Sequence, residues 1–247
     1  MIASFLTALL FALSVAFAAR SARIFGGAVA NLGRMVIALV LLGFWAEFFG
    51  QGLRGQSLPW FIYSGVIGFG LGDVALFLAL TRIGPRLTIL LTQCLAAPFG
   101  ALMEWLWLGT SLRPVQLVCG AVILCGVALA LAPGHSHHGR LHVTWAGVIF
   151  GAVAAIGQAG GAVISRKAYA VARLHELPID GLTAAFQRML GGIVTAVVCY
   201  AVIWLFKKPE MDKPKPEPVK IRRNWIWILL HALCGPVLGV GCYQWAL

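Results

Sequence analysis

Eight apolar runs, each close to the length that a membrane-spanning helix requires, dominate this sequence. A helix needs about 20 consecutive apolar residues to cross the hydrocarbon core of a bilayer. Hydrophobic residues make up 60% of the chain and charged residues only 11%, whereas a soluble domain carries about 25% charged residues. We therefore predict an all-α fold, a polytopic helix bundle embedded in the lipid bilayer. The predicted spans cover residues 2–19, 28–49, 58–80, 87–108, 115–132, 143–164, 182–206 and 225–247.

The first run admits a second interpretation, because Ala16, Phe17 and Ala18 follow an apolar core in the manner of a signal-peptidase site. No Lys or Arg precedes the run, and a signal peptide normally begins with basic residues. The pattern therefore favours a retained first helix over a cleaved signal peptide.

Basic residues exceed acidic ones by 19 to 8, which gives a net charge of +11. In a membrane protein such an excess usually gathers in loops that face the cytoplasm and anionic lipid. No basic run is interleaved with aromatic residues as in a nucleic-acid-binding surface. The sequence therefore predicts lipid, and no nucleic acid, as a partner.

The sequence contains no motif typical of a metal site, a cofactor site or a catalytic centre. The six Cys lie in apolar runs without a Cys-x-x-Cys pair, as packing residues do. The His-rich loop 133–142 holds four His but no Cys or carboxylate, so we expect a solvated loop rather than a metal site. No P-loop, nucleophile elbow or His-Glu-x-x-His motif occurs. We predict no catalytic residue, no metal and no cofactor.

The chain contains an internal repeat, in which residues 60–80 align without gaps on residues 227–247. Two glycines four residues apart recur in both copies, and such a spacing lets membrane helices pack closely. The aligned glycines are Gly68 with Gly235 and Gly72 with Gly239. Arginines and a methionine upstream recur in the same order. They are Arg20 with Arg166, Arg34 with Arg188 and Met35 with Met189.

This repeat divides the chain into a first unit, residues 1–132, and a second unit, residues 143–247, on either side of the loop 133–142. The segment 207–224 of the second unit has four Pro and many charges, which is typical of an extended solvated linker. A repeat unit of five helices is odd, so its second copy enters the membrane from the opposite side, as in inverted-repeat transporters. Because the second unit stops after three helices, we expect a C-terminally truncated ten-helix protein, with an eight-helix protein as the alternative.

Residues 81–131 form a pair of predicted helices with a recognisable order of Gly, Pro, Gln and acidic residues. The order consists of Ile83, Gly84, Pro85, Gln93, Pro98, Glu104, Trp105, Leu108 and Gly109. This pattern resembles the EamA type of the drug/metabolite transporter (DMT) superfamily, and the resemblance is sharpest over residues 60–131. Thr110 departs from the family pattern, which usually has Glu after Leu-Gly.

The resemblance implies secondary-active export or exchange of small metabolites across the plasma or inner membrane. In such a mechanism, two inverted halves would rock about a site at the bilayer midplane. The resemblance does not identify the substrate, and proton coupling is one option. An intramembrane enzyme and a non-transporting scaffold or sensor are the alternatives. Membrane orientation stays open, because the family has both termini inside whereas the Lys and Arg distribution, which depends on segment 207–224, favours an outside N-terminus.

Asp73 is the acidic residue that lies well inside a predicted span. A charge near the bilayer centre costs about 2.5–3.5 kcal/mol on insertion scales, so this carboxylate must face a cavity or a partner. Either it binds a proton or substrate, or it pairs with a nearby Arg. Its mate in the repeat is Val240, so the charge belongs to one half only.

Gln93 and Glu104 share one face of the fourth predicted span with Gly100, which is typical of a cavity wall. Glu104 lies near the end of that span beside Trp105, so an interfacial carboxylate is the alternative. Pro98 leaves a backbone carbonyl without its helical donor and either bends or packs the helix.

Gln158 and His231 are buried polar candidates in the second half, together with Gln244. Gln158 shares a face with Gly161, which indicates a cavity wall or a tight helix contact. For His231 a hydrogen bond between helices is favoured over a proton relay. Four aligned glycines are assigned to helix packing and sliding, namely Gly68, Gly72, Gly235 and Gly239.

Overall fold

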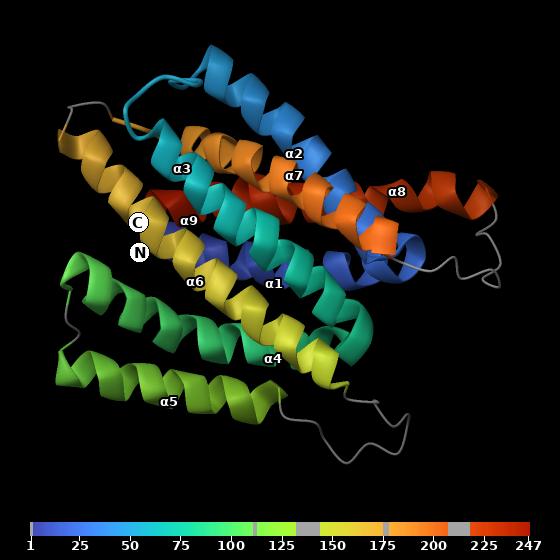
Figure 1. Ribbon diagram of the computed structural model, residues 1–247, viewed down its shortest axis with the longest axis horizontal. Coiled ribbons are helices and arrows are strands. Elements are labelled where there is room, and N and C mark those ends of the chain that lie inside the picture. The colour runs from blue at the N-terminus through green and yellow to red at the C-terminus, as the bar shows by residue number, and fades with distance from the viewer. Residues whose placement is uncertain (1, 111–112, 132–143, 175–177, 207–217) are drawn as a thin grey trace.

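A computed structural model describes residues 2–110, 113–131, 144–174, 178–206 and 218–247, and every regular element in these residues is a helix. The elements are α1 (Ile2–Phe25), α2 (Gly27–Phe48), α3 (Leu58–Gly65), π-helix η1 (Val66–Gly72), α4 (Asp73–Leu108), α5 (Pro114–Leu131), α6 (Trp145–Leu174), α7 (Gly181–Phe206), α8 (Pro218–Ala232), π-helix η2 (Leu233–Val237) and α9 (Leu238–Ala246). They form a helix bundle (Figure 1), which confirms the predicted fold class.

Six helical segments of the described residues are long and apolar enough to cross a membrane, where the sequence predicted eight spans. The difference arises at two places. Leu58–Leu108 counts as one segment of 51 residues, and the apolar part of α5, Pro114–Gly126, is shorter than a span. A straight helix of 51 residues would measure about 75 Å, against about 30 Å of hydrocarbon.

The long segment is not straight, because the backbone breaks at Gly84. The φ of this residue is 75° and its ψ is 168°, which lie outside the helical range. Glycine adopts positive φ without steric cost, and Pro85 has no N–H to continue the hydrogen-bond ladder. The chain reverses direction within α4, where teal passes into green in Figure 1. The predicted runs 58–80 and 87–108 lie in the two arms on either side of this break.

The π-helix η1 lies at the centre of the bundle, where it packs between α6 and α7. Glycines permit this close approach. A Cβ atom added at Gly157 of α6 would lie only 2.6 Å from the Cα of Gly72, and one added at Gly65 would overlap the carbonyl oxygen of Arg188. The absence of side chains at these positions therefore lets the helix backbones touch.

The third helix of each half packs mainly against the other half. The α3–η1 rod contacts α6 and α7, whereas the α8–η2 rod contacts α1 and α2, and α9, which continues this rod, contacts both α1 and α7. In Figure 1, α1 runs from left to right and α6 from right to left, and α2 and α7 likewise run in opposite directions. The two π-helices begin at Val66 and Leu233, which are equivalent positions in the repeat alignment.

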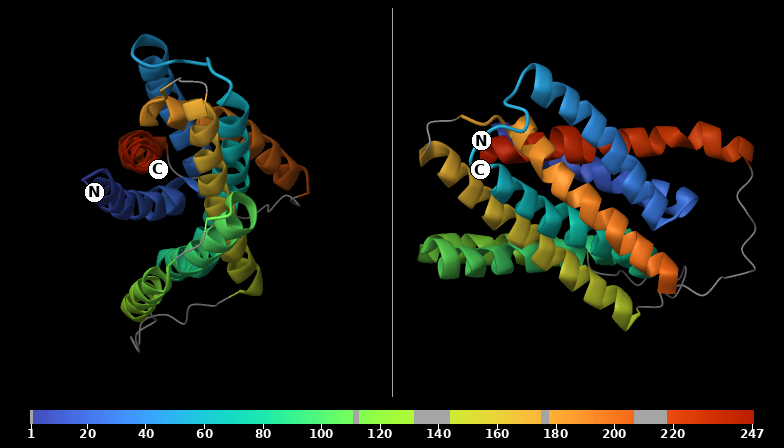
Figure 2. Two further views of the ribbon diagram at one scale, coloured as in Figure 1. Left: turned by 90° about the vertical axis from the view of Figure 1, so that its left-hand side faces the viewer. Right: turned by 45° about the horizontal axis from the view of Figure 1, so that its top comes forward.

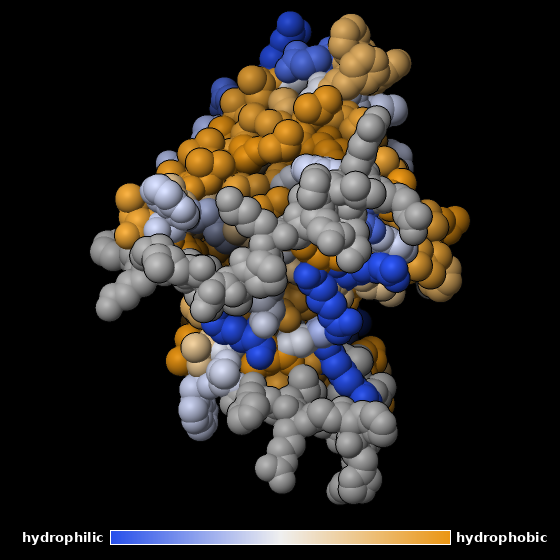
Figure 3. Space-filling model, turned by 90° about the vertical axis from the view of Figure 1, so that its right-hand side faces the viewer, coloured by the Kyte–Doolittle hydropathy of each residue, from blue (hydrophilic) through white to orange (hydrophobic). Residues whose placement is uncertain are grey.

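Apolar side chains cover much of the outer surface. The two views of Figure 2 show α5 standing apart from the bundle beside the second arm of α4, its packing partner. Its side chains point outward, with Val118 63% and Leu129 78% exposed. Figure 3 shows broad apolar areas on one end of the molecule. Such a surface is suited to contact with lipid rather than water.

The predicted linker is shorter than expected. Helix α8 begins at Pro218, so the last part of the segment 207–224 is helical. Proline is well tolerated in the first turn of a helix because the N–H there needs no helical partner, which explains the start at this position. Residues 207–217 and the His-rich loop 133–142 lie outside the described residues.

Gly157→Ala should destabilise the bundle, because the added methyl group meets the backbone of Gly72 at 2.6 Å. Overpacking of this kind costs about 1–3 kcal/mol. We expect the melting temperature of the purified protein in detergent to fall by several degrees, as followed by circular dichroism.

Gly126→Ala on α5 is the matched control, because no atom lies within 4 Å of the added Cβ. Its melting temperature should stay at the wild-type value or rise slightly, since Ala favours the helix over Gly. Equal melting temperatures for the two variants would contradict the close crossing of η1 and α6.

Candidate functional site

A buried hydrogen-bonded network joins three helices and is the most extensive charged feature among the described residues. The Arg34 guanidinium of α2 forms a hydrogen-bonded ion pair with the Asp73 carboxylate at the start of α4. Arg34 Nε also donates to Asn31 Oδ1 at 3.0 Å, and Asn31 Nδ2 donates to the Tyr200 hydroxyl of α7 at 3.3 Å. All four side chains are buried.

Local helix geometry and burial explain this arrangement. Asn31 and Arg34 are three residues apart, so they project from the same face of α2. An unpaired charge buried here would cost several kcal/mol, and pairing with additional hydrogen bonds offsets that cost. The Phe77 ring lies 5.4 Å from the Arg34 guanidinium carbon and shields it further. The network therefore neutralises an Arg and an Asp that could not remain separately in this interior.

A hollow of about 910 Å³ adjoins the network at the end of the bundle where α1 passes into α2. Its lining comes from α1, α2, α4 and α7, and includes Tyr200 and Arg82. Because Tyr200 accepts the hydrogen bond from Asn31, the hollow and the network share a side chain. Figure 3 views this end of the molecule and shows hydrophilic side chains gathered in its middle between apolar areas.

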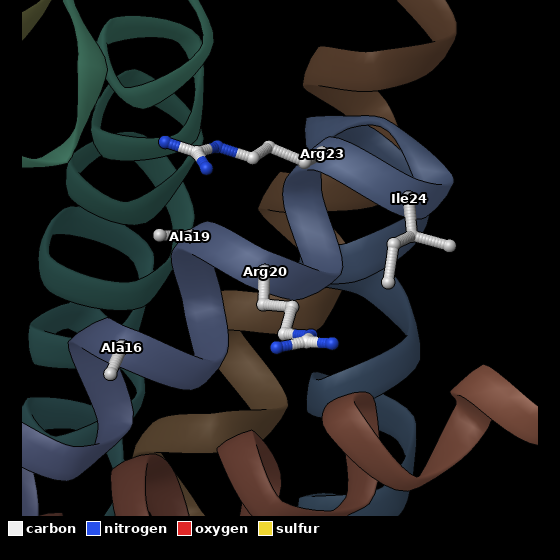
Figure 4. A pocket seen from close by; sticks show the side chains of 5 residues that line it. All are labelled: Ala16, Ala19, Arg20, Arg23 and Ile24. Atoms are coloured by element: carbon white, nitrogen blue, oxygen red, sulfur yellow. The ribbon is translucent and has the colours of Figure 1, made fainter.

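A second hollow, of about 350 Å³, is less suited to ligand binding. Its lining residues all belong to α1, and Figure 4 shows the guanidinium groups of Arg20 and Arg23 diverging from each other. Arg20 already stacks on the Trp227 ring, with its guanidinium carbon 4.2 Å from the ring centre. Since no group from another helix converges on this hollow, we do not assign it a ligand.

Glu104 forms a second ion pair, with Arg166 of α6. Their closest atoms, Glu104 Oε2 and Arg166 Nη1, are 2.5 Å apart, and the two side chains are 21% and 40% exposed. Such partly exposed pairs contribute little to stability. The pair connects the second arm of α4 to α6 and lies apart from the Asp73 network in the contacts that the structure records.

A chain of hydrogen bonds follows one face of α6. Gln244 Nε2 of α9 donates to Ser165 Oγ at 3.4 Å, and the hydroxyls of Ser165 and Ser64 are 2.8 Å apart. Ser64 Oγ in turn donates to the Gly161 carbonyl at 2.6 Å. These groups are buried, so α3, α6 and α9 meet along a polar contact in the interior.

The structure does not bring the sequence-predicted polar candidates together. Asp73 and His231 are buried, but His231 lies beside the Phe77 ring at 5.7 Å and its Nδ1 has no hydrogen-bond partner. Gln158 is half-buried, whereas Gln93 is exposed on the outer side of α4 together with Pro98. Of the two alternatives for Asp73, pairing with an Arg is the one observed.

The four glycines that the sequence assigned to helix packing all lie at buried helix contacts. Gly72 meets α6 as described above. On the other side of the bundle, a Cβ added at Gly235 would lie 2.7 Å from Ser14 Oγ, and one added at Gly239 would lie 2.8 Å from the Phe11 ring. The η2 region therefore packs closely on side chains of α1, whereas η1 meets the backbone of α6.

Sequence reasoning gave no role to Arg34, Asn31 or Tyr200, although Arg34 was noticed as a mark of the repeat. A signal was present, because an Arg inside an apolar run is as costly in a membrane as an Asp and needs a partner of opposite charge. Applying the same argument to Arg34 as to Asp73 would have suggested the pair. The parts of Asn31 and Tyr200 depend on the packing of α2 against α7, which the sequence pattern does not specify.

The family model described as the EamA-like transporter family matches residues 1–132, which is more than half of the chain. No curated protein matches the sequence.

Asp73→Asn should destabilise the bundle strongly, because it leaves the buried Arg34 charge without a counter-charge. Breaking a buried pair by removal of one partner costs about 3–5 kcal/mol. Adding Arg34→Gln to this variant removes the orphaned charge, so the double variant should melt at a higher temperature than Asp73→Asn alone in detergent.

Glu104→Gln supplies the comparison, because it breaks the partly exposed pair with Arg166. A pair of this kind contributes about 0–1 kcal/mol, so the melting temperature should change little. If Asp73→Asn and Glu104→Gln lowered the melting temperature equally, the buried network would contribute no more to stability than the partly exposed pair.

Proposed function

The chain belongs to the EamA-like transporter family, and we propose that it is a secondary-active transporter that exports or exchanges a small metabolite by alternating access. Its family and its apolar helices make it a multi-pass membrane protein. We propose the plasma or inner membrane as its location. Its substrate would be a small molecule, and the lipid bilayer would surround its helices.

We further propose eight membrane crossings arranged as an inverted repeat, with units at 1–132 and 143–247. The break at Gly84 supports two crossings within Leu58–Leu108, and α5 would supply another despite its short apolar part. Opposite running directions of α1 and α6, and of α2 and α7, favour inversion (Figure 1). Equivalent starts of η1 and η2 in the alignment favour a common ancestry of the two units.

The reciprocal packing of the third helices is the observation that carries the proposal. Because the α3–η1 rod packs on α6 and α7, and the α8–η2 rod packs on α1 and α2, the packing groups are not the two halves of the sequence. We infer one bundle of α1, α2, α8, η2 and α9 and another of α3, η1, α4, α6 and α7, which meet along the contacts of α7 with α2 and α9. Two similar bundles that face each other provide the parts that alternating access requires.

The Arg34–Asp73 network crosses the boundary between these bundles. Arg34 and Asn31 belong to α2, whereas Asp73 and Tyr200 belong to α4 and α7. We infer that this network holds the bundles together beside the hollow of about 910 Å³ and separates when the bundles rock. In this account Asp73 acts as the counter-charge of Arg34 rather than as a proton carrier.

No specific observation favours the two alternative functions. For an intramembrane enzyme, the buried His231 would have to activate a nucleophile, but its recorded ring neighbour is Phe77. A scaffold or sensor would not require two equivalent bundles joined by a charged network. The transporter is therefore the function that we propose.

Counterflow in proteoliposomes tests transport directly. Vesicles are loaded in turn with unlabelled amino acids, carboxylates, sugars and organic cations, and each receives the labelled form outside. A transporter produces transient accumulation of label for at least one class, because exchange is coupled to the opposing gradient. Absence of counterflow for every class, with correctly folded protein in the vesicles, would sink the proposal.

Asp73→Asn should slow this counterflow at least about tenfold, because a network that separates when the bundles rock stabilises only one of the two states, and each loss of about 1.4 kcal/mol lowers the population of that state relative to the other about tenfold. Glu104→Gln is the matched control and should stay near the wild-type rate. If both variants lost counterflow to the same extent, the Arg34–Asp73 network would have no specific role in transport.

The double variant Arg34→Gln with Asp73→Asn separates the two alternatives for Asp73. If the carboxylate only neutralises Arg34, the response of counterflow to an imposed pH gradient should be the same in the double variant as in the wild type. Retained counterflow together with a lost pH response would instead identify Asp73 as a proton carrier and overturn our assignment.

A further inference from the structure

A second arginine is buried in the bundle without the partners that Arg34 has. Arg188 lies in α7 and is only 5% exposed, and its Nε has no hydrogen-bond partner. Within the described residues the structure records no ion pair and no hydrogen bond for its guanidinium. Its guanidinium carbon lies 5.1 Å from the centre of the Phe69 ring, and the Asp73 carboxylate attracts it from a distance without forming an ion pair.

The repeat explains what is missing. Arg188 aligns with Arg34, and the same offset aligns Asn31 with Ala185, while Asp73 aligns with Val240. The positions equivalent to Asn31 and Asp73, the two partners of Arg34, are therefore the apolar residues Ala185 and Val240, and both are buried. One half of the protein keeps a complete Asn–Arg–Asp arrangement, and the other half keeps only the Arg.

The spatial contacts agree with this alignment. In the first half, a Cβ added at Gly27 would lie 3.2 Å from the Phe77 carbonyl. Its mate in the second half, Gly181, approaches α9 in the same way, since a Cβ there would lie 3.0 Å from the Trp245 backbone nitrogen. Trp245 is one residue beyond Gln244, the mate of Phe77. Val240 itself belongs to one buried apolar cluster with Ala185 and Met189, so it packs against α7 as Asp73 lies against α2.

An Arg without an ion-pair partner is costly in the interior of a membrane protein. A guanidinium stays protonated in proteins, so it cannot lose its charge as a buried Lys can. A cation–π contact offsets only part of the cost of burying an unpaired ion. Intramembrane charges of this type usually mark the path of a substrate or an ion.

Other unsatisfied polar groups lie along the adjacent face of α6. The glycines at 68 and 161 leave room for the guanidinium, because a Cβ added at either would lie 3.1 or 3.2 Å from Arg188 Nη2. One and two turns further along α6 come Ser165, which holds Gln244, and Tyr169. The Gln244 Oε1 and the Tyr169 hydroxyl are buried and have no hydrogen-bond partner.

We propose that Arg188 binds the oxyanion group of the transported substrate, which is a small organic anion that also carries a hydrogen-bond donor. This inference rests on the proposed transport function and identifies the substrate class. The fork of Arg N–H groups matches a carboxylate or phosphate in bidentate geometry. A donor on the ligand, such as a hydroxyl or amino group, would satisfy Gln244 Oε1. The substrate thus takes the position that Asp73 occupies beside Arg34.

Binding is tested first without transport, by thermal stabilisation of the full chain in detergent. The probes are small carboxylates and organic phosphates, each paired with its neutral amide or ester, and inorganic phosphate and chloride alone. At least one organic anion should raise the melting temperature while its neutral counterpart does not. No stabilisation by any organic anion, or equal stabilisation by inorganic phosphate or chloride alone, would overturn the proposal.

Arg188→Gln should weaken the stabilising anion at least about tenfold, as removal of a buried charged partner does. Arg188→Lys keeps the charge but loses the fork, so it should retain part of the affinity. Unchanged affinity in Arg188→Gln would exclude this arginine as the anion site.

A second variant tests whether the position of Val240 lies beside the Arg188 guanidinium. Val240→Asp should supply the missing carboxylate, so it should be tolerated when Arg188 is present and should lower the melting temperature when combined with Arg188→Gln. It should also abolish stabilisation by the anion, whereas Val240→Asn, of nearly equal size, should not. Equal destabilisation by Val240→Asp with Arg188 present and with Arg188→Gln would contradict the placement of Val240 beside Arg188.

Counterflow distinguishes failure of this inference from failure of the proposed function. If the transported solutes are neutral or cationic, and Arg188→Gln leaves their counterflow unchanged, the anion site is overturned and the transporter function is kept. Anion binding that depends on Arg188, without counterflow of any solute, would keep the anion site and overturn transport.

Discussion

A charge buried among membrane helices costs several kcal/mol unless an opposite charge lies beside it, and the ion pair of Arg34 with Asp73 supplies such a partner between two groups of helices. The pair can form only because α2, α4 and α7 converge there. That convergence depends in turn on glycines such as Gly72, which let η1 lie against α6. Close packing at Gly72 and charge neutralisation at Asp73 therefore occur at neighbouring residues of one helical segment.

The two π-helices lie at corresponding positions of this arrangement. A π-helical turn widens the helix locally and is frequently found at functional sites. Here η1 leads directly into Asp73, and η2 leads into the helix that carries Val240 and Gln244. A π-helical turn thus precedes the charged Asp73 in one half and the apolar Val240 in the other. Equal backbones with unequal side chains are what a transporter needs if a symmetric frame is to bind an asymmetric substrate.

The fold was largely predictable from the sequence, and the candidate site was not. Apolar runs and the helix break before Pro85 follow from local chemistry, so the helices and the reversal at Gly84 could be anticipated. The start of α8 at Pro218 could not, because a run rich in Pro and charge resembles a linker whichever residue begins the helix. Gln93 was expected on a cavity wall because of its helix face alone, yet a face does not reveal which neighbour covers it, and the side chain is exposed.

The sequence by itself determined that this chain is a bundle of membrane helices and that Asp73 needs a partner, and it predicted that the two halves repeat. These properties depend on composition, period and the cost of a charge in lipid, all of which can be read residue by residue. Only the tertiary structure decided that the partner is Arg34, and that Arg188 lacks one among the described residues. The physical reason is that neutralisation is a contact between helices far apart in the chain, and such contacts exist only once the helices have packed.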